Sequence, residues 1–118
     1  MSAIGGVIFF KADGVQYKAK GVFTYNLGGE KREMVAGADS VHGYKTEIKI
    51  PFIEGAITDS PDLDVKGLQA LVDADIILEL ANGKTVSLAG ACYAHDGDIT
   101  TEEGEIPVRY EGTSAREV

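Results

Sequence analysis

The chain has 118 residues, of which 44% are hydrophobic and 25% charged, a composition typical of one globular domain with its own core. Its formal charge of −8 argues against a protein that grips nucleic acid, because affinity for phosphates depends mainly on Lys and Arg. No apolar run approaches the roughly 20 residues that span a bilayer, so a membrane-spanning segment is not expected. Residues 1–6 lack the basic region of a secretory signal, so such a signal is not expected either.

The first third of the chain reads as strands joined by tight turns. Residues 7–12 (VIFFKA) are apolar, and Asp13-Gly14 is a two-residue hairpin signal that leads into residues 15–20. Residues 21–27 alternate in polarity again. Three large side chains on one face of this strand are expected in the core: Phe23, Tyr25 and Leu27.

Residues 28–43 (GGEKREMVAGADSVHG) interrupt this pattern with four glycines, several charges and no clear period. They predict a long connection with a short strand at residues 33–36. Connections longer than about 12–15 residues are usually functional or disordered. Two readings therefore stay open: a poorly ordered hairpin tip, or an arm that becomes ordered only against a neighbouring subunit.

Residues 44–58 (YKTEIKIPFIEGAIT) have the strongest strand character in the chain. Ile48, Ile50 and Phe52 alternate with Glu47, Lys49 and Pro51, as expected of a strand with one wet face. At about 3.3 Å per residue the run would reach roughly 50 Å. A compact domain of this size is only about 35 Å across. The strand is therefore predicted to bend, at Pro51 and Gly55, or to project from its domain.

One helix is predicted after this strand. Ser60-Pro61 would cap its start, with Asp62 and Asp64 in the first turn. An apolar stripe at helical spacing would rest on the sheet, made of Val65, Leu68, Leu71 and Val72. Because so short a helix is marginal alone, its role is expected to be structural.

The last third again indicates hairpins. Residues 76–80 and 84–91 flank Asn82-Gly83, which predicts a type I′ turn. Residues 105–110 form another strand, and residues 113–118 are expected to fray. The whole chain is thus predicted to be one domain, a mainly antiparallel β-sandwich or split barrel with one flanking helix.

The residues indicate no active site and no cofactor. Cys92 excludes an internal disulfide, and with His95 it supplies only two of the four ligands that zinc requires, since His42 is isolated. A solvated acidic turn explains the cluster Asp96, Asp98, Glu102 and Glu103 better than a calcium site, because the EF-hand pattern is incomplete. No phosphate-binding or dinucleotide-binding glycine motif follows a strand and opens a helix, and an enzyme is not expected.

Three segments resemble the tail tube protein family of Mu-type contractile-tailed bacteriophages, usually encoded by prophages. They are residues 5–59 (GGVIFF through GAITD), residues 78–88 (LELANGKTVSL) and residues 100–112 (TTEEGEIPVRYEG). The resemblance implies packed β-sheets with one helix. It also implies rings, generally hexameric, that stack into a hollow tube within the contractile sheath. DNA would pass through this tube into the host.

The resemblance further implies partners and a location. The partners are copies of the chain itself and the tail sheath, baseplate and terminator proteins. The chain would reside in the virion tail after assembly in the bacterial host cytoplasm.

Two segments are expected to join subunits in such a tube. The self-assembly arm comprises Gly29, Glu30, Lys31, Arg32, Val35, Asp39 and His42. The strand that would pair with a neighbouring subunit comprises Tyr44, Lys45, Glu47, Lys49 and Ile53. In this strand the charged residues would face an acidic lumen that repels phosphate. Ile48, Ile50 and Phe52 would face the core.

Two alternatives stay open from the sequence. The first is a tube subunit of a type VI-like secretion system, which would share the architecture. The second is a monomeric acidic β-module that binds calcium or another ligand.

Overall fold

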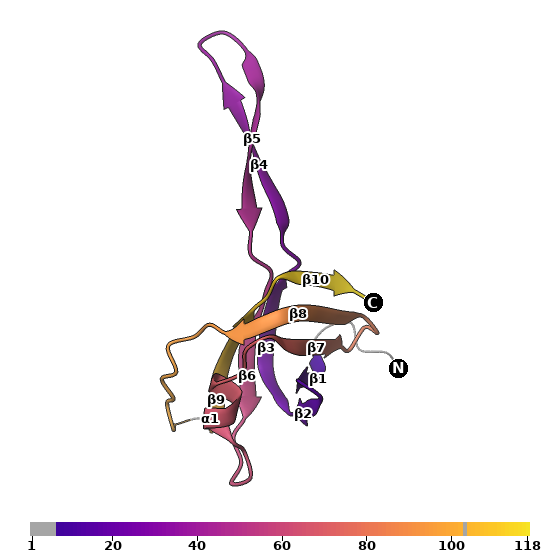
Figure 1. The fold of residues 1–118 in the computed structure, drawn as a ribbon, viewed down its shortest axis with the longest axis vertical. Coiled ribbons are helices and arrows are strands. Elements are labelled where there is room, and N and C mark those ends of the chain that lie inside the picture. The colour runs from indigo at the N-terminus through magenta and orange to yellow at the C-terminus, as the bar shows by residue number, and fades with distance from the viewer. Residues whose placement is uncertain (1–6, 103) are drawn as a thin grey trace.

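Ten β-strands and one short helix make up the part of the chain that the computed structural model describes, residues 7–102 and 104–118 (Figure 1). Residues 1–6, where no secretory signal is expected, and Glu103 of the acidic cluster lie outside the described residues. The elements before the helix are β1 (Val7–Ala12), β2 (Val15–Tyr17), β3 (Ala19–Asn26), β4 (Gly29–Ala36), β5 (Val41–Lys49) and β6 (Phe52–Thr58). The others are α1 (Val65–Gln69), β7 (Ala74–Leu80), β8 (Thr85–Tyr93), β9 (Glu105–Glu111) and β10 (Ser114–Glu117).

Eight of these strands form one antiparallel sheet that curls into a split barrel. Its order is β2-β1-β7-β8-β9-β6-β3, and β10 also pairs with β8. The two ends of this order are consecutive in the chain, because only Lys18 separates β2 from β3. The rings of Phe10 in β1 and Phe23 in β3 lie 5.5 Å apart across the opening. The mainly β fold predicted from the sequence is therefore confirmed.

The barrel interior is filled by every second side chain of its strands, because successive side chains of a strand point to opposite faces of the sheet. Phe10 lies at its centre and contacts the rings of Tyr17, Phe23 and Tyr110. The fully buried aliphatic side chains include Ile53, Ile57, Ile76, Leu78, Val86, Leu88, Ile106 and Val108. Phe23 and Tyr25 pack against this core as predicted, but Leu27 is 38% exposed because it lies where the chain leaves the barrel.

The helix is shorter than predicted and begins later. α1 is capped by Asp64, whose carboxylate accepts a hydrogen bond from the Gly67 N–H at 3.0 Å, so the predicted cap at Ser60-Pro61 is wrong. The Tyr110 hydroxyl donates to the Leu68 carbonyl at 2.7 Å and ties the helix to β9. Leu68 is buried, whereas Val72 is 74% exposed because it follows the helix end and does not continue its stripe.

The predicted hairpins are present, with one difference in turn type. Asp13 and Gly14 both have positive φ, as a type I′ turn requires. The second hairpin has a three-residue loop, in which the Gly83 N–H donates to the Leu80 carbonyl at 3.0 Å and Gly83 alone has positive φ. This geometry is a type I turn followed by a bulge, so the predicted type I′ turn at Asn82-Gly83 is wrong.

The C-terminal segment is ordered, contrary to the prediction of a frayed tail at residues 113–118. β10 pairs with β8 from Ser114↔Ala89 to Glu117↔Val86. Lys84 Nζ and Glu117 Oε2 form an ion pair at 2.7 Å. The prediction failed because a short strand without large apolar residues gives almost no periodic signal.

The long run at residues 44–58 is two strands with a break at Ile50 and Pro51. The buried face changes at this break, because Pro51 and Ile53 are buried while Ile48 and Ile50 are 84% and 58% exposed. The predicted core face of Ile48, Ile50 and Phe52 is therefore wrong. Gly55 is no bend either. The irregularity lies in β3 opposite, where the register shifts between Lys20 and Thr24.

Candidate functional site

The most distinctive feature of the molecule is an arm formed by β4 and β5. These strands pair only with each other in the described residues, from Gly29↔Lys49 to Ala36↔Val41, and project far from the barrel (Figure 1). The molecule measures 62 × 38 × 28 Å, and its radius of gyration is 17.2 Å, well above the roughly 13–14 Å of a compact chain this long. The predicted long connection at residues 28–43 is thus mostly ordered strand, and the predicted projection is real.

The direction of the arm is fixed at its root. Gly28 has a φ of +79°, and its N–H donates to the Asn26 side-chain oxygen at 2.7 Å. A Cβ on Gly28 would lie 3.0 Å from Pro51 Cδ and 3.2 Å from the Lys49 carbonyl. Only glycine adopts this backbone conformation freely. The two strands therefore leave the barrel through a tight passage that a side chain at position 28 would disturb.

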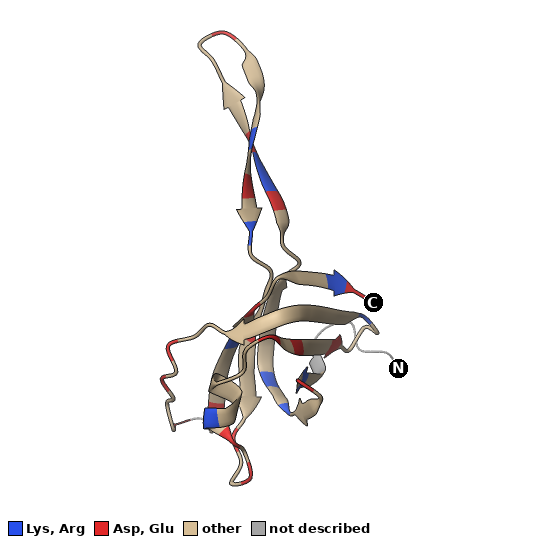
Figure 2. Ribbon diagram, viewed as in Figure 1, with Lys and Arg blue, Asp and Glu red and all other residues tan. Residues whose placement is uncertain are grey.

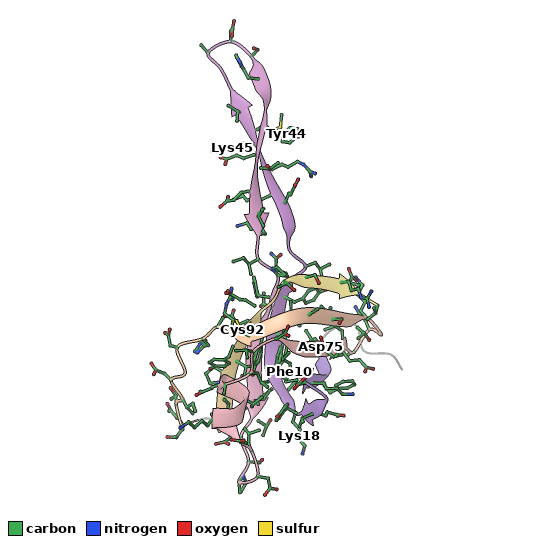
Figure 3. All side chains as sticks on the ribbon, viewed as in Figure 1. Phe10, Lys18, Tyr44, Lys45, Asp75 and Cys92 are labelled. Atoms are coloured by element: carbon green, nitrogen blue, oxygen red, sulfur yellow. The ribbon has the colours of Figure 1, made fainter. Side chains whose placement is uncertain are left out.

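The arm has two chemically different faces, because residues opposite each other in an antiparallel pair lie on the same side. The apolar face contains the pairs Met34↔Tyr44 and Ala36↔Val41, together with Glu30↔Ile48 and Arg32↔Thr46. The charged face contains Lys31↔Glu47, Glu33↔Lys45 and Lys49, with Val35 nearer the tip. Figure 3 shows Tyr44 and Lys45 on opposite sides of the arm.

Large side chains of the apolar face are open to solvent. Ile48 is 84% exposed, Met34 65%, Val41 62% and Tyr44 60%. The Arg32 guanidinium lies 5.9 Å from the centre of the Tyr44 ring. An isolated two-stranded hairpin is at best marginally stable in water, and a row of exposed apolar side chains is typical of an interaction surface.

The charged face is balanced and not acidic. Three of its charged residues are basic and two are acidic, and Lys45 Nζ and Glu33 Oε2 lie 3.5 Å apart. Lys45, Glu47 and Lys49 do share one face, as predicted from the alternation. However, a face with a slight positive excess is poorly suited to line an acidic lumen.

The net charge lies at the other end of the molecule. Residues 29–49 contain four acidic and four basic residues, so the arm contributes nothing to the formal −8. Segments 58–64 and 94–105 contain eight Asp and Glu and no Lys or Arg. These two segments are neighbours, since the Asp59 N–H donates to the Gly104 carbonyl at 2.9 Å. Figure 2 shows acidic residues at this end, opposite the arm.

Most of the residues predicted to join subunits are found on the arm. Gly29, Glu30, Lys31, Arg32, Val35, Tyr44, Lys45, Glu47 and Lys49 belong to β4 and β5, His42 lies at the register shift and Asp39 at the tip. Ile53 is the exception. It is completely buried in β6, which already pairs with β3 and β9, so it has no surface to offer.

Sequence reasoning missed Met34, Val41 and Ile48 as members of one exposed face. Only part of their signal was present: after the tip at residues 37–40, Tyr44 and Ile48 alternate with charged residues, but before it four charged residues (30–33) are followed by three apolar ones (34–36). In β5 the alternation is also shifted by one residue, because His42 is the extra residue of a bulge between Gly43, opposite Val35, and Val41, opposite Ala36.

The residues considered for metal binding do not converge. Among residues 7–102 and 104–118 no group of three or more His, Cys, Asp or Glu is placed to hold a metal ion. Cys92 is exposed on β8, whereas the Nδ1 atom of His95 accepts a hydrogen bond from the Gly97 N–H at 3.4 Å. No helix in the described part of the chain is long and apolar enough to cross a membrane.

Comparisons with known proteins agree with a self-assembling β-protein. A family model described as phage tail tube protein matches residues 1–117. A solved structure, the tube-terminating cap of an anti-feeding prophage determined by cryo-EM, is similar with a TM-score of 0.63 and 9% sequence identity. The match covers 93% of this chain and 86% of that one, and at this identity it supports the fold alone. No curated protein sequence matches the chain.

Proposed function

Since the chain belongs to the phage tail tube protein family, we propose that its copies form rings, generally of six subunits, that stack into a tube through which DNA passes. Family membership makes the chain a structural, non-enzymatic component of a virion tail. We further propose that the tail is contractile, with sheath, baseplate and terminator proteins as partners, and that the tube assembles in the host cytoplasm.

One observation carries the proposal that the arm joins subunits: a two-stranded sheet projects from the barrel with its large apolar side chains in water. The outer edges of β4 and β5 pair with no other strand in the described residues. Exposed edges and apolar rows of this kind promote association with another chain. In a tube, neighbouring copies would cover them.

Charge supports the passage of DNA without binding. A negative wall repels phosphate, and the acidic residues of segments 58–64 and 94–105 are the largest store of negative charge in the chain. We therefore assign the lining of the bore to these two segments and not to Lys45, Glu47 and Lys49 of the arm.

The proposal is tested by replacing the arm while keeping the barrel. Residues 30–48 are exchanged for Asn-Gly, which leaves Gly29 and Lys49 as the closing pair of a two-residue hairpin. Removing both strands is preferable to trimming residues 29–39, which would leave β5 unpaired. The expected result is a β-type circular-dichroism spectrum, weaker only by the share of the removed strands, and no rings or tubes in negative-stain micrographs.

The wild-type protein provides the comparison. It is expected to form rings and stacks of variable length at high concentration. Wild-type protein that stays monomeric to millimolar concentration in sedimentation would contradict the proposal. Single rings that never stack would indicate an end cap instead, and an arm-less variant that still forms tubes would remove the arm from the assembly mechanism.

A further inference from the structure

The outer face of the barrel has a shallow hollow over β7, β8 and β10. Its volume is about 390 Å³, and it is lined by Asp75, Ile77, Ser87, Ala89, Ser114 and Arg116. Strand register places Ile77, Ser87 and Arg116 in one row across the three strands, with Ala89 and Ser114 in the next. The centre of this face is therefore made of small side chains, with the charged residues at two of its margins.

The apolar face of the arm has the opposite relief. Met34 and Tyr44 form a cross-strand pair of two large, exposed side chains, with Ile48 further toward the root. Small side chains on one surface and large ones on the other allow close packing. Two surfaces that both carry large side chains would not pack as closely.

The charges of the two surfaces also match. Arg32 and Glu30 lie beside the large side chains on the apolar face of the arm, and they contact each other at 3.5 Å with side chains that are 62% and 55% exposed. At the hollow, Asp75 and Arg116 are exposed and take part in no ion pair within the described residues. Each surface thus offers one acidic and one basic residue, and these can pair crosswise.

We propose that the apolar face of the arm of one subunit seats in the β7–β8–β10 hollow of a second copy. Met34 and Tyr44 cover Ser87 and Ala89, Arg32 faces Asp75, and Glu30 faces Arg116. This inference rests on the proposed function, because it names the surface that receives the arm during self-assembly.

A second hollow is less suitable than the β7–β8–β10 hollow as the receiving site for the arm. A groove of about 440 Å³ lies at the root of the arm, and its walls include Ile48 of the arm and Ile50, which follows the end of β5. A receiving site built from Ile48 would leave the same residue unavailable as part of the guest. The β7–β8–β10 hollow contains no arm residue, so every subunit can offer its arm and receive another at the same time.

A contact between two different surfaces is heterologous, and it repeats until it closes a ring or extends a filament. The arm points along the longest axis of the molecule, whereas the hollow lies on the barrel (Figure 1). The contact therefore joins an arm to the barrel of a copy displaced along that axis, which favours stacking over the formation of a closed dimer.

The first test reverses charges across the proposed contact. Arg32→Asp and Asp75→Arg are each expected to raise the concentration required for assembly at least tenfold, measured by sedimentation, because each places like charges together. The double variant is expected to return within about threefold of the wild type. Lys45→Asp, on the charged face of the arm, combined with Asp75→Arg serves as the control and is expected to show no rescue.

Rescue in the first double variant alone would support the inference. A double variant as impaired as the worse single variant, in protein whose wild type assembles, would overturn the inference and leave the proposed function intact. A wild type that fails to assemble under any condition would instead contradict the proposed function.

The second test uses cross-linking in a Cys92→Ser background, where no native thiol competes. Tyr44→Cys with Ala89→Cys is expected to give a ladder of covalent multimers on oxidation, because the two Cα atoms would approach within reach of a disulfide. Lys45→Cys with Ala89→Cys reports the opposite face of the arm. Equal ladders from both pairs, or none from the first pair in assembled protein, would overturn the inference.

Discussion

Ile48→Thr tests whether the exposed apolar face of the arm stabilises the assembly and not the subunit. Ile48 is 84% exposed, so nearly all of its side chain is available to a partner. Complete burial of such a side chain contributes about 1.5–3 kcal/mol. Threonine retains one methyl group and a high strand propensity, so the variant keeps the arm but forfeits about 1–2 kcal/mol for each contact.

The expected effect on assembly follows from this free energy. A loss of about 1–2 kcal/mol for each contact raises the concentration at which tubes form by roughly 5–30-fold. The free subunit should change by less than about 0.5 kcal/mol, because the substituted side chain touches mainly solvent. Light scattering measures the first quantity, and chemical denaturation of the unassembled protein measures the second.

Glu47→Thr is the matched control, one residue away on the charged face of the arm. It introduces the same side chain and also keeps the strand, but it removes only one member of an exposed cross-strand pair. Exposed charge pairs contribute about 0–1 kcal/mol. Equal assembly concentrations for Ile48→Thr and Glu47→Thr would refute the assignment of the binding energy to the apolar face.

Two further predictions concern the root of the arm and the barrel. Gly28→Ala is expected to abolish assembly and lower the melting temperature by a few degrees, because an alanine with φ near +79° is strained and its Cβ crowds Pro51. Gly14→Ala carries the same kind of strain with no atom within 4 Å of its Cβ, and should assemble normally; equal behaviour of the two variants in sedimentation would contradict this. Burial, with smaller contributions from Tyr93 and Tyr17, raises the pKa of Tyr110 far above its usual value near 10. The folded state therefore holds this proton more tightly than the unfolded chain, and its stabilising effect is complete below pH 10 and is lost as the pH rises further. Tyr110→Phe should cost about 1–1.5 kcal/mol at pH 7 through the lost hydrogen bond to Leu68, but should weaken the alkaline decline measured by urea unfolding; an identical decline in both proteins would exclude Tyr110 as its source.

The barrel was largely predictable because its signals are local and agree with its burial. Strand β1 follows from an apolar run and an Asp-Gly turn, and the β7–β8 hairpin follows from alternation on both sides of Asn82-Gly83. The apolar side chains that alternate along β7 and β8, such as Ile76, Leu78 and Leu88, are completely buried. The apolar side chains of these strands pack against other strands of the same chain, so the hydrophobic pattern correctly predicts which side chains are buried.

The apolar side of β5 was predicted to face the core, but in the folded subunit it is exposed. Alternation in β5 correctly indicated a strand and correctly separated Ile48 from Glu47 and Lys49. The inference that the apolar side must be a core assumed a partner within the chain, and the barrel provides none. Pro51 and Ile53, on the other side of the break, are buried. Alternation before a proline therefore does not predict which side chains are buried after it.

The small size of the proposed contact has a consequence for how assembly starts. One face of the arm, eight residues long and two strands wide, covers roughly 250–300 Å² at about 3.3 Å per residue and 4.8 Å between strands. Stable pairs usually bury about 800 Å² on each partner, so a single arm in a single hollow would dissociate readily. In a stack of rings each subunit makes this contact twice, once as guest and once as host, and contacts within the ring add to it. Assembly should therefore begin slowly, with a lag that pre-formed tube fragments abolish, and then proceed quickly. Subunits that associated without a lag at every concentration would require a larger pairwise surface than the arm provides.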